Sequence, residues 1–289
     1  MRADLTLALI ALIWGTTFVL VKRALDDVTP FLYLAIRFSL AAVILMGWFR
    51  RRIRLGFGKQ EFHAGLQIGA VLMLGYILQT VGLQTTTPSK SAFLTGLYIV
   101  LVPFAAALVY RNKPRKLEVC GVLIAGIGMG LLSMQGETFS IATGDLLSIG
   151  CAVAFAAHIV LLGHWAPRLG FESLSLLQII AAAAVAIVAT PLVESPAIRW
   201  SPAVIWAILV GGVLATALAF VLQTWAQERT TSTRAALLFS LEPVFALLVS
   251  WHVEGEIFTM RAAAGALLIL GGILLVELKP AAVPAHPLS

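Results

Sequence analysis

The stretch that decides the fold is Gly75–Pro103, which reads GYILQTVGLQTTTPSKSAFLTGLYIVLVP. Residues 219–243 repeat its pattern as AFVLQTWAQERTTSTRAALLFSLEP. Leu78-Gln79-Thr80 in the first stretch returns as Leu222-Gln223-Thr224 in the second, 144 residues later. Both stretches place polar side chains and prolines within otherwise apolar sequence, which indicates a paired site.

The composition excludes a water-soluble protein. Of the 289 residues, 60% are hydrophobic and 12% are charged, and the mean hydropathy is +0.97. So few charges cannot cover that much apolar side chain in water. The net charge of +6 and the pI near 9.7 do not require a nucleic-acid partner. The basic residues lie in short loops between apolar runs, as they do in membrane proteins.

Apolar runs long enough to cross a bilayer occur along the whole chain. A spanning helix needs about 20 mostly apolar residues, and it satisfies its own backbone hydrogen bonds in lipid. The first run lacks a small-residue cleavage site and ends at Lys22-Arg23, so we interpret it as an uncleaved span. We predict an all-α integral membrane protein with ten transmembrane helices: 5–22, 31–49, 63–83, 89–110, 117–134, 144–163, 173–193, 203–226, 233–251 and 258–277.

Lysines and arginines are distributed unequally between alternate loops. Fourteen of the 20 lie on the same side as the amino terminus, Lys113 and Lys279 among them. Five lie on the opposite side: Lys22, Arg23, Lys90, Arg199 and Arg261. Because positive loops stay inside, both termini are expected in the cytoplasm.

The repeat extends over nearly the whole chain. Residues align at a shift of 141 early in the chain and 144 later, as in Trp14 with Phe155, Thr17 with His158, Arg37 with Gln178, Lys90 with Arg234 and Leu97 with Leu241. We therefore divide the chain into residues 5–134 and 144–277, with five spans each. Because five is odd, the second repeat is expected to be inverted. Inverted repeats are typical of secondary transporters that hold substrate near the bilayer midplane.

Local motifs, taken in order, resemble the EamA-type transporters of the drug/metabolite transporter superfamily. They are Ala11-Leu12-Ile13-Trp14-Gly15, Arg37-Phe38, Phe93-Leu94-Thr95-Gly96-Leu97-Tyr98 and Leu241-Glu242-Pro243. The resemblance covers residues 5–277 and implies export of small metabolites, amino acids or drug-like compounds by alternating access. It also implies a cavity lined by spans 1, 3, 4, 6, 8 and 9, and it leaves the substrate open.

Glu242 is the one acid among 14 that is expected deep within a span. A charge there costs several kcal/mol, so the carboxyl must face a cavity, find a partner or stay protonated. A role in proton coupling or gating is one interpretation. The alternative is a structural carboxyl that satisfies backbone groups freed by Pro243.

Arg37 is the second intramembrane charge. A planar guanidinium suits an anchor for a substrate anion. The alternative is a structural arginine that caps carbonyls of a neighbouring helix or reaches toward the outer face. Because the resemblance places spans two and seven outside the cavity, the structural interpretation is favoured.

The remaining polar and aromatic residues of the spans are candidate substrate contacts. Tyr76 and Gln79 are three residues apart, hence on one helix face, and Tyr98 lies at a similar depth. Rings with a few amides suit an amphipathic small molecule, but packing and interhelical hydrogen bonds explain them as well. Gln79 and Gln223, one in each repeat, are also candidates for matched gates.

Span one and its equivalent complete the predicted lining with Trp14, Thr17, Phe155 and His158. A lone histidine among alanines is either a proton carrier or a hydrogen-bonded core residue. No metal site is expected, because His158 and His164 lack a second pair of ligands at suitable spacing.

We predict a secondary transporter of the bacterial inner membrane, an exporter whose halves rock about bends at Pro103 and Pro243. Its expected partners are a small-molecule substrate and the lipid bilayer, with protons as a candidate coupling ion and no cofactor. Small-residue faces in spans five and ten favour packing of these spans within a monomer over a dimer. The rival hypotheses are a channel, a lipid scramblase and an intramembrane enzyme. The enzyme is disfavoured because a second acid or a nucleophile with its base is lacking at membrane depth.

Overall fold

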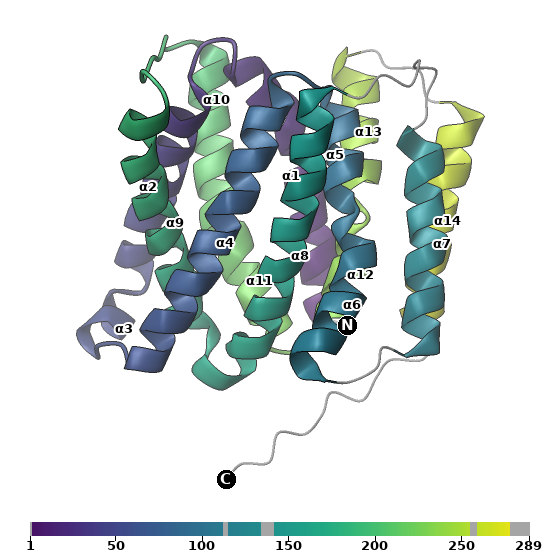
Figure 1. Ribbon diagram of the computed structural model, residues 1–289, viewed down its shortest axis with the longest axis horizontal. Coiled ribbons are helices and arrows are strands. Elements are labelled where there is room, and N and C mark those ends of the chain that lie inside the picture. Colours follow the sequence, from purple (N-terminus) through teal and green to yellow (C-terminus); the bar gives the residue numbers. More distant parts are fainter. Residues whose placement is uncertain (1, 112–114, 134–141, 255–258, 278–289) are drawn as a thin grey trace.

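The computed structural model describes residues 2–111, 115–133, 142–254 and 259–277, and over these ranges the chain is almost entirely helical (Figure 1). Lys113 and Lys279, which entered the charge count, lie outside the described residues. The described part contains no β-strand, although an isolated antiparallel bridge joins Val28 to Ile198. The elements are α1 (Arg2–Ala24), α2 (Pro30–Trp48), α3 (Arg50–Arg54), α4 (Lys59–Leu83), α5 (Pro88–Gly96), α6 (Tyr98–Tyr110), α7 (Lys116–Ser133), α8 (Thr143–Leu169), α9 (Phe171–Val193), α10 (Pro202–Leu209), η1 (Val210–Leu218), α11 (Ala219–Gln227), α12 (Ser232–Phe239), α13 (Glu242–Glu254) and α14 (Met260–Glu277).

Eight helical segments of the described chain are long and apolar enough to cross a membrane, and Met260–Val276 is a shorter apolar helix. Large apolar side chains such as Leu108, Leu192 and Met260 remain 78–87% exposed. In water this surface would be unfavourable, whereas lipid tails accommodate it. The chain is therefore a multi-pass helical membrane protein, and the predicted protein class is confirmed.

The predicted single span 89–110 is two helices. Leu97 separates α5 from α6, because its backbone N–H bonds to Leu94 O and Val100 N–H bonds to Leu97 O, a tighter turn than an α-helix makes. Gly96, which stabilises a helix poorly, precedes the break. Pro103 lies inside α6, six residues beyond the interruption.

The predicted span 233–251 is interrupted as well, between α12 and α13. Ser240 and Leu241 form the turn, with hydrogen bonds to Leu237 O and Leu238 O. Pro243 stands in the first turn of α13, where its missing N–H costs least. The two breaks therefore fall at Leu97 and Leu241, which are 144 residues apart.

The predicted span 203–226 contains a wide π-helical segment, η1, between α10 and α11. Its Gly211 carbonyl accepts hydrogen bonds from Thr216 Oγ1 at 2.7 Å and from Arg37 Nε at 3.2 Å. A Cβ at Gly211 would lie 2.8 Å from the Tyr33 hydroxyl. The widened turn thus admits side chains of α2 to the backbone, as π segments at functional sites commonly do.

Helix α7 packs along α14 at one edge of the molecule, where Figure 1 shows the two side by side. Their backbones approach closely at glycines, since a Cβ at Gly272 would lie 2.5 Å from Gly121 O and one at Gly128 would lie 2.6 Å from Gly265 O. Small residues allow this contact between membrane helices.

Two large apolar clusters fill the interior. One is built around side chains such as Phe38 and Leu72, and the other around Ile99 and Phe239. Trp14 and Phe155 pack against both clusters. The boundary between the clusters is where a pocket forms.

Candidate functional site

The pocket lies between the helices, where polar and aromatic side chains of both halves of the chain meet. All seven predicted substrate contacts line it, together with Glu242. The complete lining is Trp14, Thr17, Phe18, Leu72, Tyr76, Gln79, Tyr98, Phe155, His158, Ile159, Phe220, Gln223, Phe239 and Glu242. Residues from α1, α4, α6, α8, α11, α12 and α13 thus converge on one space.

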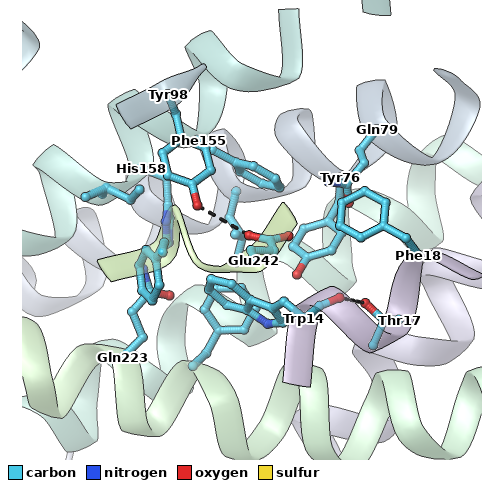
Figure 2. A pocket seen from close by; sticks show the side chains of 14 residues that line it. Trp14, Thr17, Phe18, Tyr76, Gln79, Tyr98, Phe155, His158, Gln223 and Glu242 are labelled. Atoms are coloured by element: carbon cyan, nitrogen blue, oxygen red, sulfur yellow. Dashed lines mark hydrogen bonds between the residues drawn. The ribbon is translucent and has the colours of Figure 1, made fainter. Parts of the chain in front are cut away.

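Glu242 begins α13 and carries its carboxyl into the pocket wall, where it is 7% exposed. Tyr98 begins α6, and its hydroxyl donates a hydrogen bond of 3.3 Å to Glu242 Oε2. Figure 2 shows the carboxyl between Tyr98 and Tyr76. Each partner stands directly after a helix break, so the two breaks bring the acid and the phenol together.

Trp14 is fixed by a hydrogen bond of 2.9 Å from its Nε1 to Ala215 O, at the widened segment η1. Its ring centroid lies 5.0 Å from that of Phe239 and 5.6 Å from that of Phe220. One turn further along α1, Thr17 donates to Trp14 O at 2.7 Å. Trp14 therefore presents a positioned ring, whereas the Thr17 hydroxyl is occupied by its own helix.

His158 lies against Gln178, with 2.9 Å between His158 Nε2 and Gln178 Oε1. Gln178 Nε2 in turn donates to Thr224 Oγ1 at 3.0 Å. The ring lines the pocket beside Phe220, 5.8 Å between centroids. These contacts match the hydrogen-bonded core histidine of the two interpretations given above.

The two glutamines of the repeated Leu-Gln-Thr motif differ in their surroundings. Gln79 Nε2 lies 3.5 Å from Thr95 Oγ1, a long hydrogen bond. Gln223 Nε2 donates to Gln227 Oε1 at 2.9 Å, while Gln223 Oε1 is buried without a partner. A buried acceptor without a donor is uncommon and marks the pocket wall as polar but unsatisfied.

Arg37 does not line the pocket, although it stands directly behind Tyr76. Its guanidinium carbon lies 4.7 Å from the Tyr76 ring centroid, and Nη2 lies 3.4 Å from the Tyr76 hydroxyl. Its Nε donates to Thr216 Oγ1 at 2.8 Å and to Gly211 O. No described carboxylate forms an ion pair with Arg37, which caps carbonyls as the structural interpretation expects.

Five lining residues are absent from the sequence prediction: Phe18, Leu72, Ile159, Phe220 and Phe239. Each is an ordinary apolar residue of a membrane helix, so its type carries no signal. The repeat does carry a signal for some of them, because Phe220 follows Tyr76 by 144 residues and Ile159 follows Phe18 by 141. Applying the 144-residue shift to the predicted contact Tyr76 points to Phe220, whereas Phe18 and Ile159 pair with each other and with no predicted contact.

Two partly buried ion pairs at helix starts are also absent from the sequence prediction. Lys90 Nζ lies 2.7 Å from Asp145 Oδ2 and joins α5 to α8. Arg234 Nε lies 3.0 Å from Asp4 Oδ1 and joins α12 to α1. The basic partners are 144 residues apart and the acids 141, so both pairs occupy equivalent places in the repeat.

Comparison with known proteins agrees with this architecture. The model of the EamA-like transporter family matches residues 1–134 and 142–278. An "Uncharacterized transporter" of Archaeoglobus fulgidus is 38% identical over 96% of this chain and 86% of its own. The "Uncharacterized transporter YoaV" of Bacillus subtilis is 25% identical over 92% of this chain and 93% of its own.

Two further likenesses are more limited. The "S-adenosylmethionine/S-adenosylhomocysteine transporter" of Chlamydia muridarum is 29% identical over 43% of this chain and 38% of its own. A solved crystal structure superposes with a TM-score of 0.79 over 96% of both chains at 19% identity, which shows a shared fold. Family match, membrane helices and a central pocket agree, and this membrane transporter belongs to the EamA-like transporter family.

Proposed function

We propose that the chain is a secondary transporter that exports a small metabolite, amino acid or drug-like compound by alternating access at this pocket. The observation that carries the proposal is the pairing of its lining. Twelve of the fourteen lining residues form pairs separated by 141 or 144 residues: Trp14 with Phe155, Thr17 with His158, Phe18 with Ile159, Tyr76 with Phe220, Gln79 with Gln223, and Tyr98 with Glu242. A site built twice by equivalent residues suits a protein that opens to each side in turn.

The helix contacts support two inverted five-helix repeats, residues 5–134 and 144–277. Helix α4 packs against α8 and α9, and in the exchanged pattern η1 packs against α1 and α2. Likewise α6 packs against α8 while α13 packs against α1. In this scheme α7 and α14 are equivalent and pack on each other, which accounts for two spans without a dimer.

The two equivalent ion pairs are the proposed gates. Lys90–Asp145 ties α5 to α8, and Arg234–Asp4 ties α12 to α1, so each closes one end of the bundle. Each basic residue follows a threonine cap, Thr87 or Thr231, that accepts its backbone N–H. Breaking one pair while the other holds would open the pocket to one side. Short helices α5 and α12 would move about the breaks next to Leu97 and Leu241, with Pro103 weakening α6 and Pro243 fixing the start of α13.

Glu242 is the proposed coupling residue. It is a carboxyl in the pocket wall with one hydrogen bond from the described residues, from Tyr98. Such a group can exchange a proton or a substrate charge when the pocket opens. Orientation follows the basic loops, with both termini in the cytoplasm and the chain in the bacterial inner membrane.

Reconstitution tests the proposal directly. The full chain in proteoliposomes is assayed for movement of amino acids and drug-like compounds, with and without a pH gradient. Cysteine pairs at positions 90 and 145, or at 4 and 234, are then cross-linked in a background in which Cys120 and Cys151 are replaced. We expect either cross-link to stop transport and reduction to restore it. Transport that continues with both pairs cross-linked would contradict alternating access and favour a channel, and hydrolysis without transport would favour an enzyme.

A further inference from the structure

Four hydrogen-bond donors in the pocket wall already have acceptors within the protein. Trp14 Nε1 donates to Ala215 O, Thr17 Oγ1 to Trp14 O, and Tyr98 OH to Glu242 Oε2. Gln223 Nε2 donates to Gln227 Oε1. A ligand that brings only acceptors would have to displace these bonds, which leaves protein acceptors without donors.

Two acceptors of the wall, in contrast, can take further donors. From the described part of the chain Glu242 receives one hydrogen bond, at 3.3 Å, although a carboxylate has about four acceptor positions. Gln223 Oε1 is buried and has no donor. Its orientation is fixed by the network, because Gln227 Nε2 donates to Ile159 O at 2.8 Å and so turns Gln227 Oε1 toward the Gln223 amide group. Glu242 and Gln223 Oε1 can therefore accept hydrogen bonds from donors that a ligand supplies.

Aromatic faces make up most of the remaining wall. Trp14, Phe220 and Phe239 form one group, with ring centroids 5.0 and 5.6 Å from Trp14. Tyr76 continues it, 6.2 Å from the Phe220 centroid. Ring faces attract cations, and tryptophan does so best. Here they stand next to the one carboxylate of the pocket.

Among the residues that the structure describes, no lysine or arginine lines the pocket. Arg37 approaches from behind Tyr76, where its Nε donates to Gly211 O and Thr216 Oγ1 and its Nη2 lies 3.4 Å from the Tyr76 hydroxyl. A bound anion would therefore meet Glu242 without a cationic partner in the wall. Desolvating an unpaired charge next to a like charge is strongly unfavourable.

We propose that the pocket selects a small organic ammonium ion, which donates N–H groups to Glu242 and Gln223 and lays its apolar part against Trp14, Phe220 and Phe239. The proposal rests on the transport function proposed above, for which it names the substrate class. In the complex the Glu242 carboxylate is ionised and pairs with the ammonium, and the Tyr98 hydroxyl remains its second partner.

Binding measurements on the full chain in lipid nanodiscs test the proposal without requiring transport. Three probes share one apolar body: 2-naphthylmethylammonium, 2-naphthylmethanol and 2-naphthoate. Calorimetric titration, with empty nanodiscs subtracted for partition into lipid, gives each affinity. We expect the ammonium to bind at least about tenfold more tightly than the alcohol, and the carboxylate most weakly.

Glu242→Gln should remove the preference for the ammonium while the alcohol keeps its affinity within about twofold, which also reports that the pocket is folded. Glu228→Gln, at the end of α11 and outside the pocket, is the matched control and should bind as the wild type does. Gln223→Leu should weaken binding of the ammonium probe and leave the affinity for the alcohol unchanged. If Glu242→Gln also loses binding of the alcohol, the test of the ammonium preference rests on the three wild-type affinities and on Gln223→Leu.

Equal affinities for the three probes, or tighter binding of 2-naphthoate, would overturn the proposed substrate class. Transport of neutral or anionic solutes with no preference for ammonium ions would also overturn the proposed substrate class, but it would leave the transporter proposal intact. Tight ammonium binding with no solute movement in proteoliposomes would instead contradict the transport proposal alone.

Discussion

The Tyr98 hydroxyl donates a 3.3 Å hydrogen bond to Glu242 Oε2, and the two residues stand 144 positions apart in the chain. They are the same position of the repeat, occupied by a phenol in one half and a carboxyl in the other. Each begins the helix that follows a break, α6 after Leu97 and α13 after Leu241. The structure places these two unlike groups face to face in the pocket wall.

This contact predicts a difference between two conservative substitutions. Glu242→Gln keeps the shape of the side chain but cannot bind a proton, so export should lose its dependence on an imposed pH gradient. Tyr98→Phe removes one hydrogen bond to a charged group and should lower the export rate about tenfold while the pH dependence persists. Proteoliposome assays across pH gradients measure both. Unchanged pH dependence in Glu242→Gln would show that coupling lies elsewhere.

The ion pair Asp4–Arg234 predicts charge reversal as a second test. Asp4→Asn alone should lower transport by several-fold, because one gate loses its closing contact. Asp4→Arg combined with Arg234→Asp restores opposite charges and should recover much of the rate, whereas Asp4→Arg alone should be the least active. No recovery in the double variant would mean that the pair has no gating role.

Helix packing at α7 and α14 predicts opposite results for neighbouring glycines. A Cβ at Gly272 would lie 2.5 Å from Gly121 O, whereas one at Gly271 would meet nothing within 4 Å. Gly272→Ala should destabilise the protein by about 1–3 kcal/mol, and Gly271→Ala should be neutral. Thermal unfolding of the purified proteins in one detergent measures both. Equal midpoints would contradict the close packing of these helices.

Arg37 predicts a strong preference for the guanidinium group. Its Nε and Nη2 reach Gly211 O, Thr216 Oγ1 and the Tyr76 hydroxyl, a spread that a lysine ammonium cannot cover. Arg37→Lys should therefore unfold at a lower temperature than the wild type, whereas Arg54→Lys, on exposed α3, should not. A loss of transport by Arg37→Lys at unchanged stability would instead favour a direct substrate role.

Asp27, in the loop between α1 and α2, predicts acid sensitivity outside the membrane. Hydrogen bonds from Ser201 and Arg199 hold the pKa of Asp27 below its ordinary value of 3.8. Because the folded state lowers this pKa, its contribution to stability is present at neutral pH and is lost as the pH falls below about 4. Asp27→Asn should lower the unfolding midpoint at pH 7 and match the wild type at low pH. Asp26→Asn provides the neighbouring control.

The sequence by itself determined that the protein lies in lipid and that it is helical, and it predicted which residues of the two halves correspond. Apolar runs of about 20 residues can only be membrane helices, since each must satisfy its own backbone in lipid. The shifts of 141 and 144 residues relate residues of the two halves, and the depth of Glu242 within a span marks it as a candidate site residue.

Tertiary structure decided where helices break and which groups are satisfied. The interruption at Leu97 arises from short-range hydrogen bonds that no residue type announces, so the breaks inside the predicted spans 89–110 and 233–251 could not be placed from the sequence, although both spans are present. The widened turn at Gly211 depends on Arg37 reaching it from another helix. Likewise, the ion pairs of Asp4 and Asp145 depend on contacts between helices distant in sequence. Local propensity does not contain these contacts, because their energy comes from the partner that packing supplies.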